Sequence, residues 1–189
     1  MKRFEKLLMP LIITGLMSLH GCGEKGSESS NEGEQVTESD SPEMIASPVQ
    51  NAEGKIGDTE IKVQYGSPSV KNRVIWGDLL PYDEVWRTGA NESTFVEFSS
   101  DVTVEGEPLK AGKYSLFTIP TEQGPWVVIF NSEWNLEHGH FQYREENDVL
   151  RVEANPEWTE NNQENLSISV EPNGLLIKWE KLSLPIQVQ

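Results

Sequence analysis

The sequence predicts an all-β fold: an antiparallel β-sandwich of jelly-roll or immunoglobulin-like architecture with at most one or two short helical turns. Three observations support this prediction. Between Thr59 and Gln189, β-branched and aromatic residues recur in short runs, and all six tryptophans lie in this region. Gly, Asn, Asp and Pro separate the runs, as they do in turns. No stretch of about 12 residues has helical periodicity, and only GDLLPYDEVW, residues 77–86, is a candidate for a short helical turn.

The runs expected to form strands are bounded by turn residues and are too short for helices. In chain order they are TEIKVQYG (59–66), STFVEFS (93–99), VTVEG (102–106), GKYSLFTIP (112–120), WVVIFN (126–131), DVLRVEA (148–154), LSISVEP (166–172), GLLIKWEKL (174–182) and LPIQV (184–188). The dipeptide Asn173-Gly174 is a strong hairpin signal. The segment EGEP, residues 105–108, is expected to form another turn.

The run WVVIFN is expected to be a central strand that is covered on both faces. In a strand, Trp126, Val128 and Phe130 point to one face, while Val127 and Ile129 point to the other, so both faces are apolar. The run LSISVEP instead alternates large apolar residues with serines, a pattern typical of a strand that borders solvent.

The N-terminal residues have the pattern of a bacterial lipoprotein signal peptide. Basic residues precede an apolar run from Leu7 to Leu19, which contains Pro10 and is shorter than the roughly 20 residues that span a membrane. The run ends in Leu-His-Gly-Cys, which resembles a lipobox, where a small residue precedes the cysteine that is diacylated. We therefore expect cleavage after residue 21 and a permanent lipid anchor on Cys22.

The mature chain is expected to be acidic, with a tether before the folded domain. Residues 1–21 contain three basic residues and one acidic residue, so 12 Lys and Arg face 30 Asp and Glu in the remainder. This balance disfavours nucleic acid as a partner. Residues 22–57 are rich in Gly, Ser, Glu and Pro and lack aromatic residues, which predicts a disordered acidic tether followed by a sandwich at residues 58–189. Because Cys22 is the only cysteine, no internal disulfide is expected.

The segment QYGSPSVKNRVIWGDLLPYDEVWRTGANESTFVEFSSDVTVEGEPLKAGKYSLFTIP, residues 64–120, resembles a family designated domain of unknown function 2911. The motifs that carry the resemblance are YGxPSVK, IWG, PYxxVWRTGANE and AGxYxL before Ile-Pro, and the similarity continues through WVVIFN and DVLRV. The resemblance implies an exported, lipoprotein-type protein of Bacteroidetes-like bacteria and brings no activity with it. The chain departs from the family pattern at Ser67 and Asn72, where the pattern has Arg and Gly. An anion site that used Arg at position 67 would be weakened here.

The segment 65–92 is predicted to contain a ligand-binding site. It combines aromatic rings with charged and hydrogen-bonding side chains in loops between strands, a mixture that suits a sugar or another small polar ligand. The candidate residues are Tyr65, Lys71, Arg73, Trp76, Trp86, Arg87, Asn91 and Glu92.

Two alternatives exist for the same segment. In the structural alternative, Arg87 makes bidentate contacts to Glu84 or Glu92 and to backbone carbonyls, and Asn91 adopts a left-handed conformation. In the catalytic alternative, Glu92 with Asp83 or Glu84 forms the carboxylate pair of a glycoside hydrolase. Close carboxylates arise by chance in so acidic a chain, and the sequence contains no hydrolase, metalloprotease or nucleotide-binding motif.

His138 and His140 are two residues apart in a polar loop, and on a strand this spacing would place both rings on one face, where Glu137 or Glu145 would complete the ligands of a divalent metal. Two histidines in such a loop are more typical of a solvated segment, so no metal is assigned and no cofactor is expected.

These features together predict a lipid-anchored lipoprotein of the bacterial cell envelope, on the periplasmic or the surface face of the outer membrane. Its domain is expected to be a non-enzymatic binding or envelope-maintenance module that takes a glycan or a small polar ligand. The alternative function is a carbohydrate-active hydrolase.

Overall fold

The computed structural model describes residues 47–189, and every structural statement below concerns this part of the chain. Its elements are the strands β1 (Val49–Ile56), β2 (Thr59–Gly66), β3 (Phe95–Phe98), β4 (Val102–Val104), β5 (Glu107–Leu109), β6 (Gly112–Ile119), β7 (Trp126–Asn131), β8 (Asp148–Ala154), β9 (Glu157–Glu171) and β10 (Gly174–Gln187), and the 3₁₀ helices η1 (Gly139–Gln142) and η2 (Glu145–Asn147).

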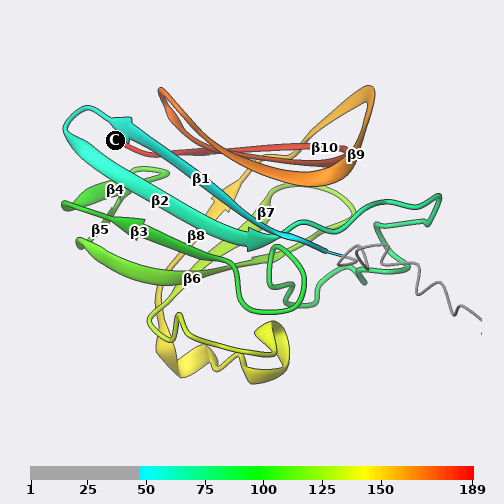
Figure 1. Cartoon of the computed structure of the whole chain (residues 1–189), viewed down its shortest axis with the longest axis horizontal. Coiled ribbons are helices and arrows are strands. Elements are labelled where there is room, and N and C mark those ends of the chain that lie inside the picture. The colour runs from blue at the N-terminus through cyan, green and yellow to red at the C-terminus, as the bar shows by residue number, and fades with distance from the viewer. Residues whose placement is uncertain (1–46) are drawn as a thin grey trace, which may run out of the picture. The chain divides into compact units, whose positions relative to one another are not determined.

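The strands form two antiparallel layers (Figure 1). One layer is a six-stranded sheet in the order β1-β2-β3-β6-β7-β8. The other contains the long β9–β10 hairpin, to which the short β4–β5 hairpin is joined by a bridge between Val104 and Val188. The expected all-β, antiparallel fold is therefore confirmed.

A single large hydrophobic cluster joins the two layers. The six-stranded sheet contributes residues such as Ile61, Val96 and Leu116, and the β9–β10 hairpin contributes Leu166 and Ile177, all of them fully or almost fully buried. Burial of each such side chain stabilises the fold by about 1.5–3 kcal/mol before the entropy cost of ordering is counted.

Strand β7 is covered on both faces, as the sequence predicts. Trp126, Val128 and Phe130 belong to the cluster between the layers. On the opposite face, Ile129 packs with Phe117 in a second, smaller cluster beneath the connection from β7 to β8. This connection, residues 132–147, matters for the site described below.

Most predicted strands lie where the sequence places them, and the differences have simple causes. Strand β9 begins at Glu157, well before Leu166. The sequence does not indicate this first half of the strand, because it is polar and exposed and so lacks an apolar alternation. The short β5 was expected to be turn. The segment 77–86 contains turns rather than a helical turn, and the two 3₁₀ helices lie in the β7–β8 connection instead.

The predicted boundary between tether and domain is corrected by the structure. Residues 49–56 form β1, which pairs along its whole length with β2, so the folded domain begins before residue 58. Gly54 lies so close to β9 that a Cβ atom there would be 2.7 Å from Val170 Cγ1. A glycine that permits close packing also weakens the sequence signal for a strand, which explains why β1 was missed.

The predicted signal peptide, Cys22 and residues 22–46 of the predicted tether lie outside the described residues. Within residues 47–189, no helix has both the length and the apolar character needed to cross a membrane.

Candidate functional site

An open cleft of about 910 Å³, here called the Arg87 cleft, is formed by segments that are far apart in the sequence. It is lined by the turn after β2 (residues 68–73), by the loop before β3 (residues 86–91) and by the β7–β8 connection (residues 137–141), with Trp179 of β10. Each segment is held by contacts that fix its lining side chains.

The turn after β2 is hydrogen-bonded to β9. Val70 donates a backbone hydrogen bond to the carbonyl of Glu164 (2.8 Å), and the backbone N–H of Lys71 donates to the Glu164 carboxylate (2.9 Å). Ser67 is buried, and its hydroxyl donates to the carbonyl of Leu166 (2.7 Å). Position 67 is thus structural in this chain and does not line the cleft.

The loop before β3 is hydrogen-bonded to β6 and β2. Trp86 and Thr118 exchange two backbone hydrogen bonds of 2.7 and 2.9 Å, so Arg87 follows directly from a fixed residue. The backbone N–H of Ala90 donates to the carbonyl of Gly66 (3.2 Å), and a Cβ atom at Gly66 would lie 2.1 Å from the carbonyl oxygen of Ala90. Only glycine fits at this crossing of β2 and the loop.

The backbone around the cleft is unusually rich in left-handed conformations. Lys71 (φ 50°), Asn72 (φ 56°), Thr88 (φ 52°) and Asn91 (φ 65°) all have positive φ. Asn tolerates this region, but a β-branched residue such as Thr88 is a genuine outlier. Thr88 is fully buried and hydrogen-bonded to Thr118 (3.2 Å), so its surroundings hold the strained conformation. Strain of this kind is concentrated at binding and catalytic sites.

Arg87 lines the cleft and contacts the β7–β8 connection. Its guanidinium donates one hydrogen bond, to the carbonyl of Asn91, and lies 5.8 Å from the ring centroid of Phe141. A Cβ atom at Gly139 would lie 2.5 Å from Arg87 Cδ, so the β7–β8 connection packs directly on the arginine side chain. Burial lowers the pKa of Arg87 from its ordinary value, and the charge of Glu92 opposes this change.

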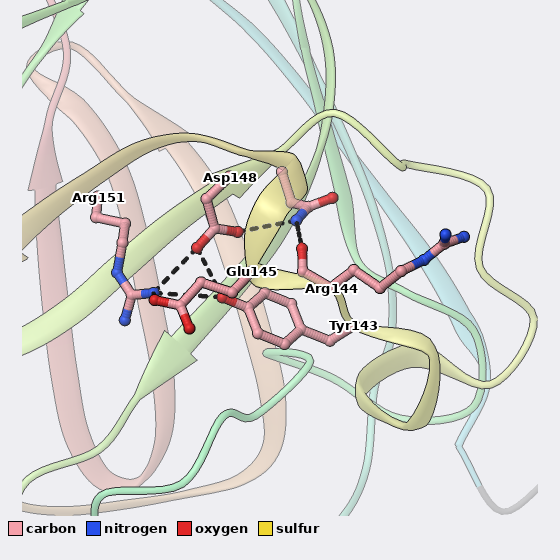
Figure 2. A network of polar contacts seen from close by, with 6 residues as sticks. Tyr143, Arg144, Glu145, Asp148 and Arg151 are labelled. Atoms are coloured by element: carbon pink, nitrogen blue, oxygen red, sulfur yellow. Dashed lines mark hydrogen bonds and ion pairs between the residues drawn. The ribbon is translucent and has the colours of Figure 1, made fainter.

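A polar network secures the base of the β7–β8 connection (Figure 2). Tyr143 donates to Asp148 (2.6 Å), Arg151 pairs with Asp148 (3.0 Å) and Glu145 (3.2 Å), and Asn131 donates to Asp148 (2.8 Å). Burial, followed by the hydrogen bond to Asp148, raises the pKa of Tyr143. The phenol therefore stays protonated and continues to donate.

Replacing Asp148 with alanine is expected to destabilise the domain by about 2–4 kcal/mol, because Tyr143, Asn131 and Arg151 lose their shared acceptor. The thermal unfolding midpoint should fall by roughly 10 °C. The matched control is Glu145→Gln, which removes an exposed partner of the same arginine and should cost about 1 kcal/mol or less. Equal shifts for both variants would show that Asp148 does not hold the connection.

Positive charge predominates in the cleft. Lys71, Arg73 and Arg87 line it, against the single carboxylate of Glu137. None of the three cations forms a salt bridge within residues 47–189. Lys62, Lys113, Lys178 and Lys181 of this region form none either, so the distinctive feature of the cleft is that three such cations line one cavity.

Aromatic rings line the cleft together with the cationic residues. Trp86 and Trp179 line the cleft and stack with their centroids 5.7 Å apart. Trp76 contacts both, and also Trp126 and Trp158, edge to face. The buried indole N–H groups of Trp76 and Trp179 have no hydrogen-bond partner in this part of the chain.

The structure brings together five of the eight predicted binding residues: Lys71, Arg73, Trp86, Arg87 and Asn91. The other three lie elsewhere. Tyr65 is buried in the core, Trp76 lines a neighbouring cavity that shares Arg73 with the cleft, and Glu92 lines a third cavity with Lys113. Sequence reasoning missed Leu79, Glu137, His138 and Phe141 as lining residues. The aromatic and charged composition of LEHGHFQY was the available signal.

The expected ion pair of Arg87 is not present. Neither Glu84 nor Glu92 forms a salt bridge with Arg87, because the guanidinium instead donates to the backbone of its own loop. The backbone part of that prediction is confirmed, as is the left-handed conformation of Asn91.

The carboxylates of the catalytic alternative do not share the cleft. Glu92 lines another cavity, and neither Asp83 nor Glu84 lines the Arg87 cleft. His138 lines the cleft, but no three His, Cys, Asp or Glu side chains are arranged to hold a metal ion among those that the structure describes, which do not include the side chain of His140.

The fold and the cleft define this protein as a two-layered, antiparallel all-β domain with a cationic, aromatic-backed cleft between its loops. Residues 47–188 match the model of the family described as "Protein of unknown function (DUF2911)". The chain belongs to the DUF2911 family, as its motifs indicate. Comparisons with curated proteins and with solved structures gave no match.

Proposed function

We propose that this chain is a lipid-anchored protein of the bacterial cell envelope and that its domain binds a small polar ligand in the Arg87 cleft without catalysing a reaction. One observation carries the binding proposal: three cations, an asparagine and two stacked tryptophans line one cleft, and none of the cations forms a salt bridge within residues 47–189. Concave sites that combine aromatic surface with a few convergent polar groups are typical of ligand binding.

The geometry favours binding over hydrolysis. A glycoside hydrolase needs two carboxyl groups on either side of one scissile bond, about 5–9 Å apart. The Arg87 cleft offers only the carboxylate of Glu137 among its lining residues. For the hydrolase alternative, neither Asp83 nor Glu84 lines the cavity that contains Glu92, and neither lines the Arg87 cleft.

The envelope location rests on the N-terminal sequence. The basic start, the short apolar run and the Leu-His-Gly-Cys motif support a signal peptide and acylation of Cys22. Cells that produce the chain should incorporate an alkyne-tagged palmitate into it, and the Cys22→Ala variant should carry no label. Labelling of the variant, or no label on either chain, would refute the anchor.

The binding proposal is tested with the mature-length chain, residues 22–189, carrying Cys22→Ser. A screen of glycans and small polar compounds should raise the thermal unfolding midpoint for at least one compound class, because a ligand that binds only the folded state stabilises it. The Arg87→Gln variant should lose this shift. The Glu92→Gln variant should keep it, since Glu92 lines a different cavity.

Two results would count against the proposal. If no compound shifts the midpoint, the cleft is not a small-molecule site. If a glycan is hydrolysed and Glu92→Gln abolishes the turnover, the protein is an enzyme.

A further inference from the structure

The Arg87 cleft concentrates positive charge on a strongly acidic chain, with 31 acidic and 15 basic residues overall. We propose that its ligand is a small amphiphilic anion. A phosphate or carboxylate group contacts Arg87, Arg73 and Lys71, and an apolar part or ring packs on Phe141 and Leu79. This inference rests on the proposed function and specifies the class of ligand.

Arg87 is the best-placed group to hold the anion. A guanidinium has five N–H donors, and that of Arg87 makes one hydrogen bond within residues 47–189, to Asn91. The remaining donors match the geometry of a carboxylate or phosphate, which arginine binds in a bidentate manner. Burial of Arg87 disfavours its charged form, and a bound anion would offset this cost.

Arg73 and Lys71 are positioned without being neutralised. The Arg73 guanidinium donates to the backbone carbonyls of Val70 (3.0 Å) and Ser69, so it is held by its own turn while keeping its full charge available. Glu164 accepts from the backbone N–H of Lys71, and its carboxylate forms no salt bridge with the Lys71 ammonium. An anion in the cleft would therefore face three cations.

The apolar part of the ligand is indicated by exposed side chains at the same cleft. Phe141 is 79% exposed and Leu79 is 42% exposed, although both line the cleft. Covering them would remove apolar surface from water.

Two sources can supply this chemistry: a soluble phosphorylated or acidic metabolite, or the head group of an anionic lipid. Ser47 lines the cleft, and its carbonyl accepts a hydrogen bond from the Asn91 side chain (3.2 Å). Ser47, the first described residue, therefore lies beside the cleft, and both sources stay within the proposal.

The test is calorimetric titration of the mature-length Cys22→Ser chain with matched compounds. Phenyl phosphate contains both an anion and a ring, inorganic phosphate contains the anion alone, and phenyl β-glucoside contains a ring and a neutral sugar. Dihexanoyl phosphatidylglycerol and dihexanoyl phosphatidylcholine, below their micelle-forming concentrations, report on a lipid source.

Phenyl phosphate should bind at least tenfold more tightly than phenyl β-glucoside, because each charge-assisted hydrogen bond contributes a factor of about ten to a hundred. It should also bind at least tenfold more tightly than inorganic phosphate, because only its ring removes apolar surface of Phe141 and Leu79 from water. Arg87→Gln should weaken the binding of phenyl phosphate by about tenfold or more, and so should Lys71→Gln. Lys71→Gln alters only an exposed side chain, so this variant stays folded and can be measured even if Arg87→Gln unfolds the domain. Lys62→Gln is the matched control, an exposed lysine of β2 outside the cleft, and should have no effect. A lipid source would instead appear as tighter binding of the glycerol lipid than of the choline lipid, with the same sensitivity to the variants.

Equal affinity for phenyl β-glucoside and phenyl phosphate would overturn the anionic ligand while leaving the binding function intact. The same conclusion would follow if phenyl phosphate bound and neither cleft variant weakened it. If none of these compounds binds but the glycan screen gives a hit at the cleft, the anion proposal fails alone. If both experiments are negative, the proposed function fails with it.

Discussion

Replacing Trp179 with alanine is expected to lower the free energy of unfolding by about 3–5 kcal/mol. Trp179 is 1% exposed, stacks on Trp86 and contacts Trp76 edge to face. Its removal opens a large cavity at the meeting point of both layers, which the surrounding rings cannot fill. In a domain of this size the thermal unfolding midpoint should fall by roughly 10–20 °C. Chemical denaturation followed by circular dichroism measures the change directly.

Trp158→Ala is the control for this prediction, because it makes the same chemical change to a ring that also contacts Trp76. Trp158 is 50% exposed, so its loss should cost about 1 kcal/mol or less. Similar destabilisation by the two variants would contradict the view that burial decides how much each tryptophan stabilises the domain.

Gly66→Ala is expected to destabilise the domain by about 3 kcal/mol and to abolish ligand binding in the cleft. The added methyl group would lie 2.1 Å from the carbonyl oxygen of Ala90, and backbone atoms cannot rotate away as a side chain does. The loop that carries Arg87 must shift, so affinity should fall together with stability. Denaturation and titration of the same protein sample separate the two effects.

Gly57→Ala provides the comparison. Gly57 occupies the turn between β1 and β2 at φ 56°, and a Cβ atom there meets nothing within 4 Å. It should cost about 1 kcal/mol from the left-handed backbone alone and leave binding unchanged. If Gly66→Ala behaved like Gly57→Ala, the close crossing of β2 and the loop would not position the site.

The fold was largely predictable because burial leaves a clear period in the sequence. Strand β7 alternates two apolar sets, and the structure places them in two different clusters. Strand β1 was not predictable in the same way. Two of its three half-buried residues, Ala52 and Gly54, are small, and Gly54 permits the close approach of β9, a contact that only the folded chain reveals.

The site was predictable only where its residues are close in the sequence. Lys71, Arg73 and Arg87 belong to neighbouring loops, so composition pointed to them. Phe141 and His138 reach the same cleft through a connection between β7 and β8, and no local pattern indicates that distant packing. Glu92 was misplaced because adjacent residues of a tight loop can point to different cavities.

The packing of Gly139 on the Arg87 side chain has a consequence for how the domain folds. The loop before β3, the turn after β2 and the connection after β7 acquire their mutual positions only through contacts between residues far apart in the chain, and such contacts form late because long segments must first be brought together. A partly folded intermediate would have its aromatic interior exposed and no assembled cleft. Ligand binding would therefore report on completed folding.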